Sequence, residues 1–274
     1  MRSMNERWSA RRRAVWAATV LWAALASASA GAQAPAFMPG GDLDLVVAGA
    51  LDSQAQIYQS AADAAVLVVS DRLPSPVLLH VRSRGVQAVP RARLREIGAG
   101  VSIERGDPLQ DLGVFVVEGT DVRFSHGAVA AALRPKPALV GEHTLEELYE
   151  HTPSYRVGAE AYTPDPSVLA KLRTVGETYR VRVVFGSWCS VCKQYLPRGL
   201  AVAGALGGAA IRFEYLGLPV EDPWHTPEVE RLGIKSLPTA IVYRGTEEIG
   251  RFAGGEEWQQ PEERLWEAIS AAKP

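Results

Sequence analysis

Short apolar runs separated by turn residues dominate the chain from Asp42 to about Leu133. The runs are LDLVVA, VLVVS, PVLLHV, VSIE, VFVV and VRF, and glycine or proline separates several of them, as is typical of β-strands. The stretch VFVVEGTDVRF predicts a hairpin with a four-residue turn. Two stretches, Ser53–Ala65 and Pro90–Ile97, have helical spacing. The pattern predicts a β-rich domain with one or two helices.

The pattern changes in RPKPALVGE (Arg134–Glu142), where two prolines and a glycine end the strand pattern and HTLEELYEH begins a helical spacing. A strand is predicted at Arg156–Tyr162. A helix that begins at TPDPS is predicted next, because the apolar residues Val168, Leu169 and Leu172 would lie on one helical face. The apolar strand YRVRVVF then leads into a further helix.

The last part of the chain continues this alternation. The strand IRFEYLGL precedes a short helix with Thr226 at its cap and Pro227 in its first turn. Two strands, TAIVYR and EIGRFA, are joined through Gly245, and a final helix begins at Pro261. The order βαβαβαββα predicts a mixed sheet with helices on both faces. The expected fold class is therefore an α/β domain preceded by a separate β-rich domain.

The first 30 residues have the three parts of a secretory signal. Five arginines precede the apolar run AVWAATVLWAALA, and small residues follow it with an A-x-A site at residues 28–30. The run is shorter than the roughly 20 residues that span a bilayer. A cleaved signal is predicted, with an uncleaved membrane anchor as the alternative, and RRR is a weak match to a twin-arginine signal. We expect an exported protein of the periplasm or cell envelope.

Four segments follow from these patterns. Residues 1–30 are predicted to be the signal peptide, and 31–41 (GAQAPAFMPGG), which lack periodicity, a linker. Residues 42–141 are predicted to be a β-rich domain of unknown function, and 142–274 the α/β domain.

The charge of the chain argues against one class of partner. Removing the five arginines and one glutamate of residues 1–30 from the totals of 29 and 31 leaves 24 basic and 30 acidic residues. No basic stripe stands out that could follow a phosphate backbone. Nucleic acid is therefore not an expected partner.

Both cysteines of the chain, Cys189 and Cys192, lie in SWCSVCK. One pair does not make the disulfide framework of small secreted domains, and closing so short a loop removes little chain entropy. A zinc site needs about four ligands, and no histidine is paired with another at ligand spacing. A reactive dithiol is favoured over both, and a binding or redox-sensor module that uses the thiols as a switch is the non-enzymatic alternative.

The position of the two thiols predicts different roles. A strand that ends in Phe185-Gly186-Ser187 would deliver Cys189 to the start of a helix, where free N–H groups and the helix dipole favour an anion. The pKa of Cys189 is therefore expected to lie below that of a free cysteine. Cys192 lies one turn into the helix, more buried and close enough to form a disulfide. Cys189 is the predicted nucleophile, and Cys192 resolves the mixed disulfide.

These residues resemble the thioredoxin family over about residues 155–274. SWCSVCK is similar to the family motif W-C-x-x-C-K, and Pro197 falls where the family kinks its helix. LGIKSLPTAIVYRGTEEIGRFAGG resembles the stretch around the family's cis-proline, with Pro238 in its place. The resemblance implies a thioredoxin fold in which Pro238 and the backbone of Leu237 hold an extended peptide. It also implies that Trp188 shields one flank of the thiols, and a tryptophan of the core is the alternative.

One position departs from many thioredoxins, which carry a buried acid six residues before the first cysteine. Val183 stands there in this chain, so Cys192 lacks that helper for its proton. His225, two residues before a helix, is interpreted as a surface capping residue, with a place near the thiols as the alternative.

The resemblance to exported TlpA-like envelope thioredoxins implies a thiol:disulfide oxidoreductase that acts on protein disulfides. Ser190 and Val191 bring no positive charge that would hold a thiolate strongly, which favours a reductase over a disulfide-forming oxidant. No metal and no dissociable cofactor is expected, since the cysteine pair carries the electrons. The expected partners are client proteins with disulfides and an upstream electron donor, with a membrane protein as one candidate.

Overall fold

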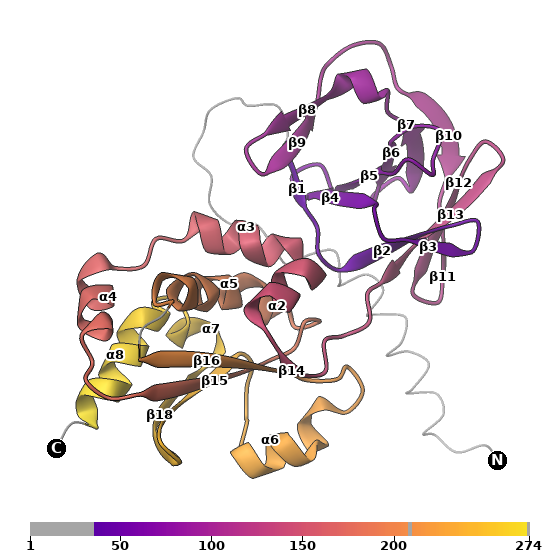
Figure 1. Ribbon diagram of the computed structural model, residues 1–274. Coiled ribbons are helices and arrows are strands. Elements are labelled where there is room, and N and C mark those ends of the chain that lie inside the picture. Colours follow the sequence, from indigo (N-terminus) through magenta and orange to yellow (C-terminus); the bar gives the residue numbers. More distant parts are fainter. Residues whose placement is uncertain (1–35, 208–209, 273–274) are drawn as a thin grey trace, which may run out of the picture. The chain divides into compact units, whose positions relative to one another are not determined.

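The computed structural model describes residues 36–207 and 210–272 and divides into two compact units, Met1–Lys136 and Pro137–Pro274 (Figure 1). The sequence placed this boundary between residues 141 and 142. In the structure the second unit begins a few residues earlier in the chain. The reason is that the backbone N–H of Leu139 already donates to Ser187 Oγ of the second unit at 3.1 Å. The predicted signal at 1–30 lies outside the described residues. Within the described part, no helix is long and apolar enough to cross a membrane.

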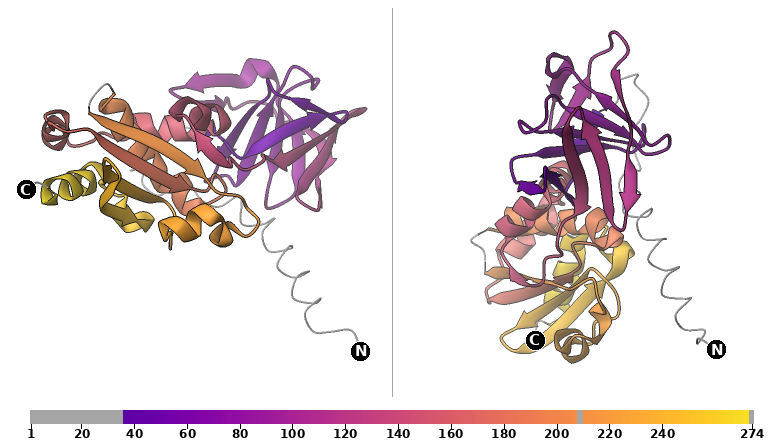
Figure 2. Two further views of the ribbon diagram at one scale, coloured as in Figure 1. Left: turned by 60° about the horizontal axis from the view of Figure 1, so that its bottom comes forward. Right: turned by 90° about the vertical axis from the view of Figure 1, so that its right-hand side faces the viewer.

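The N-terminal unit consists of two antiparallel sheets, as the predicted β-rich domain requires. Their strand orders are β10-β7-β6-β5-β4-β1-β9-β8 and β11-β12-β13-β2-β3, and Figure 2 shows them from two further sides. The strands are β1 (Ala36–Pro39), β2 (Leu43–Val47), β3 (Ala50–Asp52), β4 (Gln56–Ser60), β5 (Ala65–Val69), β6 (Val77–His80), β7 (Gly85–Ala88), β8 (Leu94–Ile97), β9 (Gly100–Ile103), β10 (Gln110–Val114), β11 (Val116–Glu118), β12 (Asp121–His126) and β13 (Val129–Pro135).

The two sheets share a buried core. Leu45 and Leu133 of one sheet and Val68 and Val86 of the other belong to the same cluster of buried side chains. Antiparallel sheets that pack face to face bury the side chains between them. The unit is therefore held together by packing between its sheets.

Both helices predicted for this unit are wrong. Ser53–Ala65 contains β4, and Pro90–Ile97 contains only a 3-10 turn, η1 (Arg91–Arg93), before β8. In β4 the neighbouring side chains Ile57 and Tyr58 pack against two different cores. Because both faces of β4 carry apolar residues, the alternation typical of a strand is hidden.

The predicted linker is also wrong where it is described. Ala36–Pro39 forms β1, which pairs with β4 and β9, and Phe37 is buried. Backbone hydrogen bonds to a strand on each side explain why this segment forms a strand although its sequence has no periodic pattern. The predicted hairpin is present as β11 and β12. Its turn is shorter than the predicted four residues, because Glu118 pairs with Asp121 and only Gly119 and Thr120 lie between them.

The C-terminal unit has a mixed five-stranded sheet in the order β14-β16-β15-β17-β18, as predicted for its class. β15 and β16 are parallel, and the other neighbours are antiparallel. Its elements are β14 (Gly141–His143), α2 (Leu145–His151), α3 (Pro153–Ala161), α4 (Pro166–Arg173), β15 (Tyr179–Phe185), α5 (Ser190–Ala205), β16 (Ile211–Gly217), η2 (Pro223–His225), α6 (Pro227–Leu232), β17 (Thr239–Arg244), β18 (Glu247–Ala253), α7 (Gly254–Glu257) and α8 (Pro261–Ala271).

Helices lie on both faces of this sheet. Val183 of β15, Leu196 of α5 and Leu265 of α8 line one small internal cavity, so α5 and α8 cover the same face. Helix α6 lies on the other side of the sheet (Figure 1).

The strand predicted at Arg156–Tyr162 is wrong, because Arg156–Ala161 belong to α3 and Tyr162 is its C-cap. Pro153 occupies the first turn of α3, and the buried residues Tyr155 and Ala159 are four apart, which is helical spacing. The sheet edge beside β16 is occupied instead by β14, which pairs with it antiparallel.

Candidate functional site

The register of the sheet brings three loops to one end. Phe185 ends β15 and lies beside Gly217, the last residue of the parallel strand β16. Thr239 begins the antiparallel strand β17 and lies beside Val184. The turn that carries the cysteines, the loop after β16 and the segment before β17 therefore leave the sheet at the same end (Figure 1).

Cys189 occupies the N-cap position of α5. Its backbone N–H donates to Gly186 O at 3.0 Å, and its carbonyl accepts from Lys193 N at 3.0 Å, which begins the helix. Its Sγ accepts from the backbone N–H of Cys192 at 3.4 Å. The sulfur thus takes the place of the oxygen that normally caps a helix N-terminus.

The pKa of Cys189 falls from its ordinary value of 9.0 to about 6. The largest cause is the hydrogen bond from the Cys192 side chain, and the backbone N–H groups of Cys192 and Val191 and the charge of Lys193 add to it, against the effect of burial. Cys189 is partly exposed. A thiol with this pKa is mostly thiolate at neutral pH and is open to attack another sulfur.

Cys192 has the opposite environment. Its side chain has no exposed surface, and burial, followed by the neighbouring Cys189, raises its pKa well above the ordinary value. Val183 is buried in the same core. Cys192 is therefore a protonated thiol that donates to Cys189 when both are reduced.

Trp188 directly precedes Cys189 in the chain. It is half-buried against the core, and its indole N–H donates to Leu218 O at 3.0 Å. A Cβ on Gly186 would lie 2.7 Å from the indole ring, so the glycine makes room for the ring. The tryptophan links the cysteine turn to the loop after β16.

Leu237 and Pro238 lie at the same sheet end and are joined by a cis peptide bond. The side chain of Leu237 is buried. The carbonyl of Pro238 accepts from the backbone N–H of Gly254 at 2.9 Å. Sequence reasoning did not single out Gly254, although it lies in the quoted GRFAGG ending, because a backbone donor has no signature of its own.

His225 does not cap the helix that follows it. The side chain of Thr226 caps α6 by accepting from Val229 N at 3.3 Å. His225 is exposed and its ring contacts Asp222 at 2.5 Å, which raises its pKa. No contact joins it to the thiols within the described residues.

The described residues do not offer a set of side chains for a metal centre. No group of three or more His, Cys, Asp or Glu side chains is placed to hold an ion there.

Neither protein-family models nor curated proteins gave a match to this chain. Among solved structures, a protein of unknown function from Pseudomonas aeruginosa is 14% identical and covers 47% of this chain and 86% of its own, with a TM-score of 0.36. A thioredoxin from Fasciola hepatica is 21% identical, with coverages of 39% and 89% and a TM-score of 0.27. Thioredoxin f from spinach chloroplast is 21% identical, with coverages of 47% and 94% and a TM-score of 0.27. Each is similar to less than half of this chain.

Proposed function

We propose that the C-terminal unit has a thioredoxin fold and that the protein is a thiol:disulfide oxidoreductase acting on protein disulfides through Cys189 and Cys192. One observation carries the proposal. Cys189 lies partly exposed at the start of α5 with a pKa of about 6, while Cys192 is buried and protonated beside it. A structural thiol pair needs no such asymmetry.

The proposed reaction has two exchange steps. The Cys189 thiolate attacks one sulfur of a client disulfide, so the client S–S bond breaks, a client thiolate leaves and takes a proton from water, and a mixed disulfide forms. Cys192 then gives its proton to water and attacks Cys189 Sγ. The mixed disulfide breaks, the second client thiolate leaves, and a Cys189–Cys192 disulfide forms. Two electrons pass from the protein to the client.

The surroundings of the thiolate support a reductase. The groups that stabilise it are the Cys192 thiol, the backbone N–H groups at the helix start and Lys193, and they lower the pKa of Cys189 to about 6, less far than the value of about 3.5 found in a strong oxidant. An upstream dithiol must then reduce the Cys189–Cys192 disulfide after each turnover. We propose an exported protein of the cell envelope, in agreement with the signal predicted for residues 1–30.

Reduction of insulin by dithiothreitol tests the proposal. The unaltered protein should accelerate precipitation of the insulin B chain, and Cys189→Ser should abolish the acceleration while changing the free energy of unfolding by less than about 2 kcal/mol. Cys192→Ser should instead accumulate a mixed disulfide with a client, visible on a non-reducing gel. Survival of activity in Cys189→Ser would contradict the proposal. A protein that is inactive on every disulfide but responds to oxidation would support the sensor alternative.

A further inference from the structure

The segment that leads to Pro238 begins at the end of a short helix. Helix α6 ends at Leu232, and Gly233 follows in the left-handed conformation with φ of 63°. The chain then runs to the cis bond at Pro238 and into β17. We name Gly233–Pro238 the docking segment.

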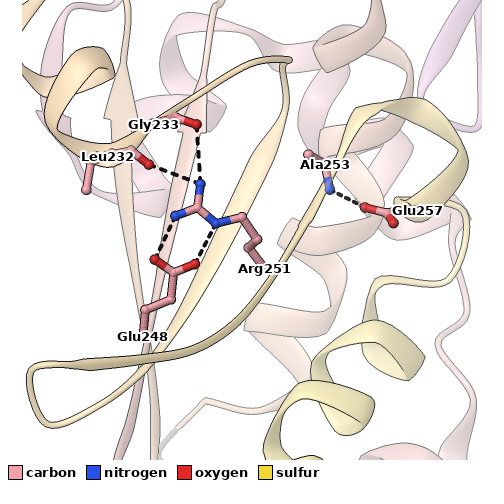
Figure 3. A network of polar contacts seen from close by, with 6 residues as sticks. All are labelled: Leu232, Gly233, Glu248, Arg251, Ala253 and Glu257. Carbon is pink, nitrogen blue, oxygen red and sulfur yellow. Dashed lines mark hydrogen bonds and ion pairs between the residues drawn. The ribbon is translucent and has the colours of Figure 1, made fainter.

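Arg251 of β18 holds the start of the docking segment. Its Nη1 donates to Leu232 O at 3.0 Å and to Gly233 O at 3.4 Å (Figure 3). Leu232 is the last residue of α6 and Gly233 is its C-cap, and at a helix C-terminus the carbonyls lack intrahelical donors and a cation is favoured. The guanidinium therefore binds the helix end to the edge strand of the sheet.

Glu248 orients this guanidinium. Its two oxygens accept from Nε and Nη2 of Arg251 at 2.5 and 2.6 Å, a bidentate pair within β18 (Figure 3). Such a pair fixes the plane of the guanidinium as well as its position. Nη1 is then left to point toward the carbonyls of α6.

The far end of the docking segment is held by the same strand. Gly254 N, directly after β18, donates to Pro238 O at 2.9 Å. The preceding residue, Ala253, donates its N–H to Glu257 Oε2 at 2.5 Å (Figure 3). β18 and its continuation thus contact both ends of the docking segment.

We propose that Arg251, oriented by Glu248, is a positioning residue that holds the docking segment in place for an extended polypeptide at Cys189. The inference rests on the proposed function, since it assigns the docking segment to clients of the exchange reaction. An extended peptide needs backbone partners at fixed positions. A small disulfide needs only the thiolate. Loss of the Arg251 contacts should therefore weaken the reaction with polypeptides selectively.

The chain offers a matched control in Arg244. Its Nη1 donates to Ala272 O at the end of α8 at 2.8 Å, and its Nη2 pairs with Glu247 at 3.4 Å. Arg244 lies beside Tyr179 at the opposite end of β15 from the cysteine turn. It has the same chemistry as Arg251, an arginine that pairs with a strand glutamate and binds a helix end, but at a distance from the thiols.

The experiment compares Arg251→Met and Arg244→Met in the full chain. For each variant, kcat/KM is measured with insulin and with the small disulfide 5,5′-dithiobis(2-nitrobenzoate). The ratio of the insulin value to the small-disulfide value should fall about five- to tenfold in Arg251→Met, through a higher KM for insulin, and stay unchanged in Arg244→Met. An equal loss with both substrates, or an equal fall of the ratio in both variants, would overturn the role of Arg251.

Glu248→Gln keeps the test decisive if Arg251→Met does not fold. This variant leaves the guanidinium in place but weakens its orientation, so a smaller fall of the same ratio is expected, and an unchanged ratio would overturn the inference. Absence of exchange with both substrates in the unaltered protein would overturn the proposed function itself, and with it this role of Arg251.

Discussion

Cys189 and Cys192 are three residues apart in the chain and yet have opposite surroundings. The sulfur of Cys189 receives a backbone N–H and a thiol hydrogen bond at a partly exposed helix start. The sulfur of Cys192 lies in the buried core of the second unit among apolar side chains. One residue is thus prepared to lose its proton and the other to keep it. This difference carries the proposed division of roles.

The first prediction concerns the pH dependence of alkylation. Because the pKa of Cys189 is lowered to about 6, its reaction with iodoacetamide should rise as pH increases through about 6 and level off above pH 7. Cys192, buried and with a raised pKa, should remain unmodified over this range. Mass spectrometry of peptides from the reduced protein measures both. A midpoint for Cys189 close to its ordinary value of 9.0 would contradict the assignment.

A second prediction is the reduction potential. The stabilisation of the Cys189 thiolate is moderate, since its pKa of about 6 lies between the values of about 7 and 3.5 found in a reductase and in a strong oxidant. We expect a potential between about −270 and −180 mV. Equilibration with glutathione buffers measures it. A value near −120 mV would indicate a disulfide-forming oxidant and reverse the proposed direction.

At the scale of elements, helix α5 carries the site, and close contacts on several sides hold it in place. Gly158 of α3 lies so near Pro197 that an added Cβ would be 2.8 Å from its Cβ. Gly199, on the same helix, lies against the ring of the buried Trp258, which would be 2.5 Å from an added Cβ. Because these two glycines have no side chain, α5 can lie close to α3 and to Trp258. These contacts fix the position of the start of α5, and with it the position of Cys189.

A matched pair of glycines tests this packing. Gly199→Ala should lower the free energy of unfolding by about 1–3 kcal/mol, because its methyl group overlaps the rigid indole of Trp258. Gly204→Ala, in the same helix with open space around it, should raise the stability by up to about 1 kcal/mol through helix propensity. Denaturant unfolding of the two variants measures the difference. Equal effects would show that Trp258 adapts without cost.

At the scale of the whole molecule, each unit has its own core. The two N-terminal clusters draw on residues between Phe37 and Leu133, and the C-terminal cluster on residues from Leu139 onward. No cluster of buried side chains mixes residues of the two units within the described ranges. The thiols and the docking segment belong entirely to the second unit.

A fourth prediction follows for the isolated second unit. A chain of residues 137–274 should fold, because its core is complete. It should reduce insulin at a rate within about twofold of that of the full chain. Circular dichroism and the insulin assay, carried out on the same preparation, measure folding and activity. A folded but inactive unit would mean that the β-rich unit takes part in client binding.

Much of the second unit could be predicted because its signals are local. Thr226 and Pro227 mark the start of α6 by their own chemistry, and Pro261 marks the start of α8 in the same way. The failures have a common cause. Tyr155 and Ala159 show helical spacing only once their burial is known, and Phe37 shows no pattern at all until two other strands pair with its segment.

The sequence by itself determined that a dithiol begins a helix, since the spacing of Cys189 and Cys192, the preceding strand and the following apolar face all lie within a few turns of chain. Only the tertiary structure decided that β14 closes the sheet edge and that Arg251 binds the end of α6. Sheet neighbours and side-chain partners are chosen by contacts between distant segments, and the periodicity of one segment says which face is buried but not what covers it. The position of the two thiols is therefore determined by local sequence, whereas the proposed docking geometry around Pro238 depends on the whole fold of the second unit.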